Sequence, residues 1–323
     1  AITETVQQIV NDDGVWKAQV AIPIRVGTRP NAITTGLDGS IWVANFGSNT
    51  VQQITNDNGV WTPQGTINVG DSRTVFVSAL TTGLDGSVWV ANNGDHTVQQ
   101  ITNENGVWTA KAAINVGKLP RALTTGLDGS IWVAFCTGTW SLLGINNGIQ
   151  QIVKDNGVWT AQAAIDVGIE PVALTTGLDG SIWVANRGSS TVQQIVNNNG
   201  VWTPQAAINV INGGLTLTTG QDGSIWVANR TTTKNTPFIG TVGTIQQIAA
   251  PPNAPSDLAA VFGAGPGEMT LAWQPPAIDG GTPVISYTAT VSQGTYTKTI
   301  TTSDTSCVFD GLTLGSGLTY FTV

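Results

Sequence analysis

The residues of this chain that are best suited to chemistry are repeated aspartates. An aspartate occurs at the same place in each copy of one short segment. The first copy is Leu37-Asp38-Gly39-Ser40-Ile41-Trp42-Val43-Ala44-Asn45, and related segments begin at Leu84, Leu127, Leu178 and Gln221. Aspartates brought together could bind a cation such as Ca²⁺. Asp-Gly is also a preferred dipeptide of tight hairpin turns. Since each aspartate belongs to a separate copy, we expect five separate turn residues and no metal site.

Other residue types suited to catalysis are scarce. The chain has one histidine, His96, and two cysteines, Cys136 and Cys307. A single histidine without an acidic partner is more often a surface residue. The cysteines lie in regions of different sequence pattern, so we expect two free, partly buried thiols. We find no Ser/His/Asp set, Cys/His cluster or phosphate-binding loop. The sequence therefore predicts no catalytic residue, no metal and no cofactor.

The composition narrows the class of protein. The 323 residues are 41% hydrophobic and 10% charged, with a formal net charge of −8. A negative charge argues against nucleic acid as the main partner, and the absence of an apolar run of about 18 residues argues against membrane insertion. Abundant Gly, Thr and Asn favour strands and turns. Low Lys content, together with an Ala1 typical of a processed start, favours a secreted or cell-surface protein.

The aspartate turn belongs to a longer repeat of about 43 to 51 residues. A segment such as Ala122-Leu123-Thr124-Thr125-Gly126 leads into the turn, and the alternating Ser-Ile-Trp-Val-Ala-Asn strand leaves it. A hairpin then follows, as in residues 51–67. Four short strands with short connections make an antiparallel meander, which at this repeat length is a propeller blade. We expect the two tryptophans of each repeat to fill the core between blades.

The number of strands suggests how the ring closes. An additional hairpin at residues 5–22 precedes the first complete repeat, and the last repeat has no fourth strand of its own after Thr244–Ile248. We expect residues 1–248 to form a five-bladed β-propeller in which Gly14–Ile22 completes the last blade. The surplus strand Thr5–Ile9 either pairs at an edge, is displaced, or marks a longer parent protein.

A second, smaller domain follows the repeats. Residues 249–255 are a Pro-rich linker, and residues 256–323 contain the motifs Leu271-Ala272-Trp273-Gln274-Pro275-Pro276 and Gly311-Leu312 followed by Tyr320. This pattern resembles a fibronectin type III domain, which implies a β-sandwich with Trp273 in the core and Tyr320 as the tyrosine corner. The last strand of that family is missing from the chain, and no cysteine is placed to pair with Cys307. The fold class is thus all-β.

The repeats resemble the blades of NHL-type and virginiamycin B lyase-like propellers over about residues 1–248, on the strength of Gly-Leu-Asp-Gly-Ser-Ile-Trp-Val-Ala-Asn followed by Thr-Val-Gln-Gln-Ile. The resemblance implies a propeller, and for the lyases a histidine base and a metal at the ring centre. Lyases, lactonases and binding modules share this blade, so the resemblance is weak evidence for function.

Differences between the repeats identify a candidate binding surface. The Asp-Gly and Asn-Gly turns are nearly uniform and form one face, here called the turn face, with ten acidic residues and one basic residue. The other connections vary and form the loop face, with seven basic residues against three acidic ones. The positive electrostatic potential expected at the loop face attracts acidic ligands. The candidate ligand-binding residues are Arg29, Arg73, Arg121, Trp140, Arg187, Arg230 and Phe238.

Three functions are compatible with this pattern. The main reading is a non-enzymatic, extracellular recognition or adhesion module that binds an acidic glycan or protein through the loop face. One alternative is a structural subunit that assembles head to tail with copies of itself into a surface filament or layer. The second alternative is a lyase- or lactonase-like enzyme, which would need a metal site at the ring centre.

Overall fold

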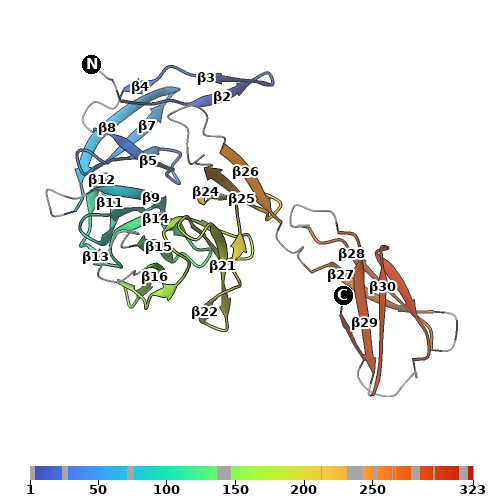
Figure 1. Ribbon diagram of the computed structural model, residues 1–323. Coiled ribbons are helices and arrows are strands. Elements are labelled where there is room, and N and C mark those ends of the chain that lie inside the picture. Colours follow the sequence, from blue (N-terminus) through green and yellow to red (C-terminus); the bar gives the residue numbers. More distant parts are fainter. Residues whose placement is uncertain are drawn as a thin grey trace, which may run out of the picture. The chain divides into compact units, whose positions relative to one another are not determined.

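The structure is a computed structural model (Figure 1). It describes residues 4–23, 28–70, 76–136, 147–211, 213–230, 243–249, 254–263, 265, 267–277, 284–293, 295–312 and 319–322. Every regular element in these ranges is a β-strand, which confirms the all-β class, and none of them contains a helix that could cross a membrane. The chain divides into two compact units, Ala1–Thr219 with Trp226–Gln246 and Gly220–Ile225 with Gln247–Val323.

Four successive repeats each form one antiparallel sheet in chain order, as the meander predicted. The first blade contains β5 (Pro30–Thr35), β6 (Ile41–Asn45), β7 (Thr50–Asp57) and β8 (Val60–Asn68). The second contains β9 (Val77–Thr82), β10 (Val88–Asn92), β11 (Thr97–Glu104), β12 (Val107–Ala110) and β13 (Ile114–Asn115). The third contains β14 (Pro120–Thr125), β15 (Ile131–Cys136), β16 (Asn147–Asp155), β17 (Val158–Ala161) and β18 (Ile165–Asp166). The fourth contains β19 (Pro171–Thr176), β20 (Ile182–Asn186), β21 (Thr191–Asn198), β22 (Val201–Pro204) and β23 (Ile208–Asn209).

The fifth repeat forms a three-stranded sheet of β24 (Gly214–Thr219), β25 (Ile225–Arg230) and β26 (Gly243–Ile248). The first strands of consecutive repeats, β5, β9, β14, β19 and β24, lie beside one another. Threonine hydroxyls link them, for example Thr81 to Thr125 at 3.1 Å and Thr175 to Thr219 at 3.0 Å. These bonds hold the end of each first strand close to the ends of its neighbours.

Three pairs of tryptophans pack between blades in the described part of the chain, as expected. The ring of the second strand in one blade meets the ring of the fourth strand in the next blade edge to face. The ring centres are 4.6 Å apart for Trp42–Trp108, 4.8 Å for Trp89–Trp159 and 4.7 Å for Trp132–Trp202. Edge-to-face packing adds to the stabilisation that burial of the rings already provides.

The repeated aspartates are turn residues, which also agrees with the sequence. Oδ1 of Asp128 accepts hydrogen bonds from the backbone N–H of Ser130 (3.0 Å) and from the Ser130 hydroxyl (2.5 Å). Oδ2 accepts a hydrogen bond from Nε2 of Gln151 at 3.1 Å. Asp38, Asp85 and Asp179 have the same three kinds of partner. Each carboxylate therefore fixes the turn of its own blade.

The N-terminal hairpin does not complete the last blade. Here β2 (Ile9–Asp12) pairs with β3 (Val15–Ala18), and the short β1 (Thr5–Val6) pairs with β4 (Ile22–Pro23). Among the described strands, β26 has no partner beyond β25, so the predicted pairing of Gly14–Ile22 with the last blade is absent.

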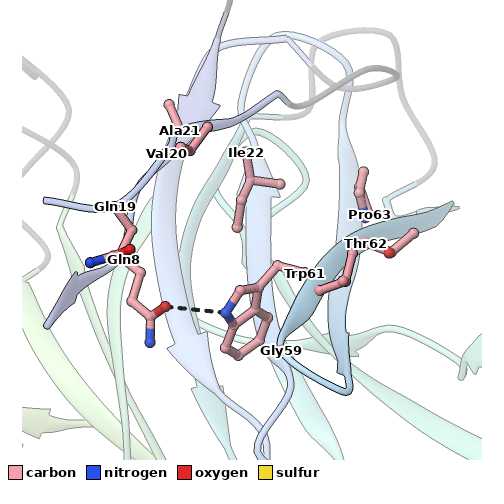
Figure 2. A pocket seen from close by; sticks show the side chains of 10 residues that line it. Gln8, Gln19, Val20, Ala21, Ile22, Gly59, Trp61, Thr62 and Pro63 are labelled. Carbon is pink, nitrogen blue, oxygen red and sulfur yellow. Dashed lines mark hydrogen bonds between the residues drawn. The ribbon is translucent and has the colours of Figure 1, made fainter.

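The hairpin lies instead against the first blade. Figure 2 shows the indole of Trp61 directed at Gln8, whose Oε1 accepts a hydrogen bond from Trp61 Nε1 at 3.2 Å. A cavity of about 690 Å³ separates residues 19–22 from residues 59–63. Residues of β1, β4 and β8 pack on the buried Val43 and Ile54. This apolar contact and the Gln8 hydrogen bond hold the hairpin at the first blade.

The second unit has two three-stranded antiparallel sheets. One is β27 (Ser256–Phe262), β28 (Met269–Gln274) and β31 (Ser306–Phe309), and the other is β30 (Tyr296–Thr302), β29 (Tyr287–Gln293) and β32 (Thr319–Thr322). Leu271, Trp273 and Val291 are in the shared core, as expected for Trp273. Cys307 is a free thiol in this core, and the side chain of Tyr320 lies outside the described residues.

Candidate anion-binding site

A cavity of about 330 Å³ opens on the loop face beside the first strands of the blades. Its lining comes from two sets of equivalent positions. Ser78, Arg121 and Val172 are each the second residue of a first strand. Phe46, Asn93 and Arg187 each follow the last residue of a second strand. These two positions differ in residue type from copy to copy, although the strands around them are nearly identical.

Arg121 is the residue of this cavity whose polar atoms are least satisfied. Its side chain is partly buried, and its Nε is fully covered without a hydrogen-bond partner in the described part of the chain. A buried N–H that makes no hydrogen bond is costly, and more so when it belongs to a charged group. Arg121 therefore brings a partly desolvated positive charge to the lining of the cavity.

Arg187 is already paired. Its Nη2 lies 3.1 Å from Oε1 of Glu170, and its Nε donates to Oε2 at 3.3 Å. The hydrogen bond to Glu170 raises the pKa of Arg187, burial opposes this effect, and the negative charge of Glu170 adds a smaller increase. The Glu170 side chain is 12% exposed and that of Arg187 is 41% exposed. The outer part of the Arg187 guanidinium thus remains accessible to a ligand.

The ring of Phe46 forms one wall of the cavity. Phe46 stacks on Phe76 with ring centres 4.6 Å apart and planes at 15°. The guanidinium carbon of Arg29 lies 5.8 Å from the centre of the Phe46 ring, within cation–π range. Arg29 is therefore next to the cavity wall but is not part of the lining. The wall gives a flat apolar surface beside two cationic groups.

Hydrogen bonds fix the backbone that carries Arg121. The carbonyl of Pro120 accepts from the Ser78 hydroxyl at 2.7 Å and from Nδ2 of Asn93 at 2.8 Å. Nδ1 of His96 accepts from the backbone N–H of Leu119 at 3.1 Å. The same Nδ1 lies 3.0 Å from the carbonyl oxygen of Asn93, so this ring nitrogen contacts the backbone on both sides of the loop. His96 is thus part of the support of this loop.

The structure brings two of the seven predicted ligand-binding residues, Arg121 and Arg187, to one cavity, with Arg29 beside it. Arg73, Trp140 and Phe238 lie outside the described residues, as does the side chain of Arg230. The sequence reasoning did not single out Phe46, Ser78, Asn93 or Val172. The sequence could have identified these four residues, because they occupy the same repeat positions as Arg121 and Arg187. In the part of the chain that is described, no three His, Cys, Asp or Glu residues are grouped to hold a metal ion.

Comparisons with known proteins identify the fold. No family model and no curated protein sequence matches the chain. A structure of streptogramin B lyase matches with a TM-score of 0.51 and 21% identity, over 66% of this chain and 66% of that chain. A protein from Bacteroides fragilis, provisionally named a 6-phosphogluconolactonase, matches with a TM-score of 0.56 and 14% identity over 84% of each chain. Neither comparison provides evidence for a fibronectin type III domain in the second unit.

A third structure extends the likeness along the chain. Catalytically inactive virginiamycin B lyase from Staphylococcus aureus with quinupristin matches with a TM-score of 0.50 and 19% identity, over 99% of this chain and 100% of that chain. The expectation of a non-enzymatic chain is therefore corrected, because solved proteins that share its architecture include one named as a lyase and two provisionally named as 6-phosphogluconolactonases. At these identities the likeness establishes the fold, and the repeat-containing unit of this chain is a β-propeller.

Proposed function

We propose that the cavity between Arg121 and Arg187 binds the anionic group of a small-molecule substrate, and that the chain is a lyase- or lactonase-like enzyme acting on that substrate. The lining of one cavity by two arginines is the observation that carries this proposal. A carboxylate or phosphate oxygen placed in the cavity would accept hydrogen bonds from these guanidinium groups, and charge-assisted hydrogen bonds of this kind are stronger than neutral ones.

The other polar groups of the cavity support an anion over a neutral ligand. The Ser78 hydroxyl and one of the two Nδ2 hydrogens of Asn93 are occupied by the Pro120 carbonyl. The charged donors that line the cavity are the guanidinium groups of Arg121 and Arg187, the latter shared with Glu170. A volume of about 330 Å³ suits a single small molecule, at the lower end of the usual range for ligand pockets. The Phe46 ring would lie against an apolar part of the same ligand.

The enzyme assignment rests on the fold neighbours and on simple chemistry. A 6-phosphogluconolactonase, as its name states, opens a cyclic ester that carries a phosphate. Opening an ester places negative charge on the carbonyl oxygen in the transition state, and a positioned cation stabilises that charge. Arg121 and Arg187 could thus hold the substrate's acidic group or its reacting oxygen.

Two further assignments are part of the proposal. We infer that the ring has five blades, because five copies of the first and second strands are present. The second unit is assigned to the fibronectin type III class, supported by its two sheets and by the contact of Trp273 with Tyr287, whose ring centres are 5.5 Å apart.

The experiment combines binding and turnover. Calorimetry with 6-phosphogluconate should show binding that Arg121→Gln weakens by about tenfold or more. Lys118→Gln is the matched control, because Lys118 is an exposed cation three residues away that does not line the cavity. Opening of 6-phosphogluconolactone, followed by base uptake at constant pH, should be faster than in buffer and slower with Arg121→Gln. Equal binding by both variants would overturn the site, and opening of this and other lactones at the buffer rate would overturn the enzyme assignment.

A further inference from the structure

Two grooves open between neighbouring blades at the Asp-Gly turns, on the turn face. The groove between the third and fourth blades has a volume of about 300 Å³ and is lined by Leu127, Asp128, Asp179, Asn197 and Trp202. The groove between the second and third blades has about 330 Å³ and equivalent lining, with Leu84, Asp85, Asp128, Lys154 and Trp159. Each groove thus combines an exposed leucine, two carboxylates and one face of a half-buried tryptophan.

The two grooves differ at one informative position. Lys154 is directly opposite Trp159 in the β16–β17 pair, and Asn197 is directly opposite Trp202 in the β21–β22 pair. Nζ of Lys154 lies 5.8 Å from the centre of the Trp159 ring, which is a cation–π distance. The groove between the second and third blades therefore contains an ammonium group supplied by the chain. Among the described residues, no cationic side chain lines the groove between the third and fourth blades.

Lys154 is an exception to the repeat. At the same position, Asn11, Asn56, Asn103 and Asn197 each accept a hydrogen bond from the N–H of the turn glycine three residues later, at 2.7–2.8 Å. Lysine has no acceptor and cannot make this bond. The turn of the third blade thus forgoes a stabilising bond, while its lysine places an ammonium group on the tryptophan. The groove between the second and third blades thus accommodates an ammonium group beside an aromatic ring.

The carboxylates of the groove between the third and fourth blades can accept further hydrogen bonds. Oδ1 of Asp179 accepts two hydrogen bonds from Ser181, whereas its Oδ2 accepts one, from Gln194. Asp128 has the same arrangement with Ser130 and Gln151. Each carboxylate oxygen has two lone pairs, so both Oδ2 atoms can accept another donor. Their charges disfavour anions and attract cations on this acidic face.

We propose that the groove between the third and fourth blades binds an alkylammonium group, placed on Trp202 as the Lys154 ammonium is placed on Trp159. The ligand class is a primary amine with an aliphatic stem, and the stem would contact Leu127. Two sources have this chemistry, a free polyamine and a lysine side chain of a polypeptide. This site is separate from the arginine cavity, which lies at the opposite ends of the strands.

The experiment exchanges the residues of the two grooves. Amide and indole NMR signals of ¹⁵N-labelled protein are followed during titration with spermidine and, separately, with the peptide acetyl-Gly-Gly-Lys-Gly-Gly-amide. Signals of Val196, Asn197 and the Trp202 indole should shift. Asn197→Lys should weaken this binding by about tenfold, because the new side chain fills the groove. Lys154→Asn should add a second set of shifts at Val153 and Trp159.

Asn103→Lys is the matched control, since it makes the same charge change and loses the same turn bond in a different blade. It should leave the shifts at Asn197 and Trp202 unchanged, and equal melting temperatures would show that all variants fold. Response to spermidine alone would identify a free amine, and response to the peptide would identify a lysine side chain. The proposal is overturned if neither probe shifts these signals, or if Asn103→Lys weakens binding as much as Asn197→Lys.

Discussion

Trp42 of β6 and Trp108 of β12 meet edge to face across the junction of the first and second blades, with ring centres 4.6 Å apart and planes at 73°. Trp42 is fully buried, and Val51, Val88 and Ile101 belong to the same core cluster. The fourth strand of a blade is therefore anchored to the second strand of the preceding blade.

The first prediction concerns this anchor. Trp108→Ala removes the ring from the junction and should lower the free energy of unfolding by about 3 kcal/mol, the lower end of the range for buried aromatic residues. The same position in the N-terminal hairpin is Trp16, a residue that is 69% exposed. Trp16→Ala should cost less than about 1 kcal/mol. Urea denaturation followed by circular dichroism measures both, and equal losses would contradict a specific role for the junction.

The blade could be predicted from sequence because each strand is marked by its own alternation and each turn by Asp-Gly or Asn-Gly. The position of the N-terminal hairpin could not, because its Trp16 strand has the same pattern as the fourth strand of any blade. The choice of neighbour depends on contacts such as Gln8 with Trp61, which local pattern does not encode. Likewise, the sequence placed Arg121, Arg187 and Glu170 on one face, but it did not predict that Glu170 pairs with Arg187.

The second prediction concerns that pair. Glu170 competes with any anionic ligand for the Arg187 guanidinium, so Glu170→Gln should strengthen binding of 6-phosphogluconate by about threefold or more. The pair is partly exposed, and its loss should change stability by less than about 1 kcal/mol. Glu104→Gln is the control, because Glu104 pairs with Lys111 at an exposed site outside the cavity. Unchanged affinity in Glu170→Gln, measured by calorimetry, would exclude Arg187 from the site.

The third prediction concerns the glycine that precedes each aspartate turn. A β-carbon at Gly126 would lie 2.6 Å from Oδ1 of Asp128 and 2.9 Å from Oγ of Ser130. Gly126→Ala should therefore disrupt the turn hydrogen bonds and cost about 1–3 kcal/mol. At Gly65 a β-carbon would meet nothing within 4 Å, so Gly65→Ala should be neutral or slightly stabilising. Thermal denaturation of the two variants would reveal the difference, and similar midpoints would refute it.

The fourth prediction concerns the thiols. Cys136 and Cys307 are free and buried, in agreement with the sequence expectation, and burial raises the pKa of the Cys307 thiol. A raised pKa leaves less of the reactive thiolate at mildly alkaline pH. Iodoacetamide at about pH 8 should label neither cysteine in the native protein and both in guanidinium chloride without reductant. Mass spectrometry counts the labels, and a single label after denaturation would show that one thiol is modified or paired.

The last prediction concerns acid sensitivity of the fifth repeat. Hydrogen bonds from the Ser224 hydroxyl and backbone N–H lower the pKa of Asp222 from its ordinary value of 3.8. A carboxyl group whose pKa is lower in the folded state stabilises the protein at pH values above the unfolded-state pKa, and that stabilisation is lost as the pH falls through the folded-state pKa.

Ser224→Ala removes the hydroxyl bond, so the melting temperature of this variant should be below the wild-type melting temperature at about pH 7. The difference should shrink as the pH approaches about 2.5, because protonated Asp222 no longer benefits from the bond. Ser303→Ala, at an exposed position in the second unit, should show a small difference that does not depend on pH. A difference for Ser224→Ala that stays constant across this range would mean that Asp222 does not depend on Ser224 for its charge.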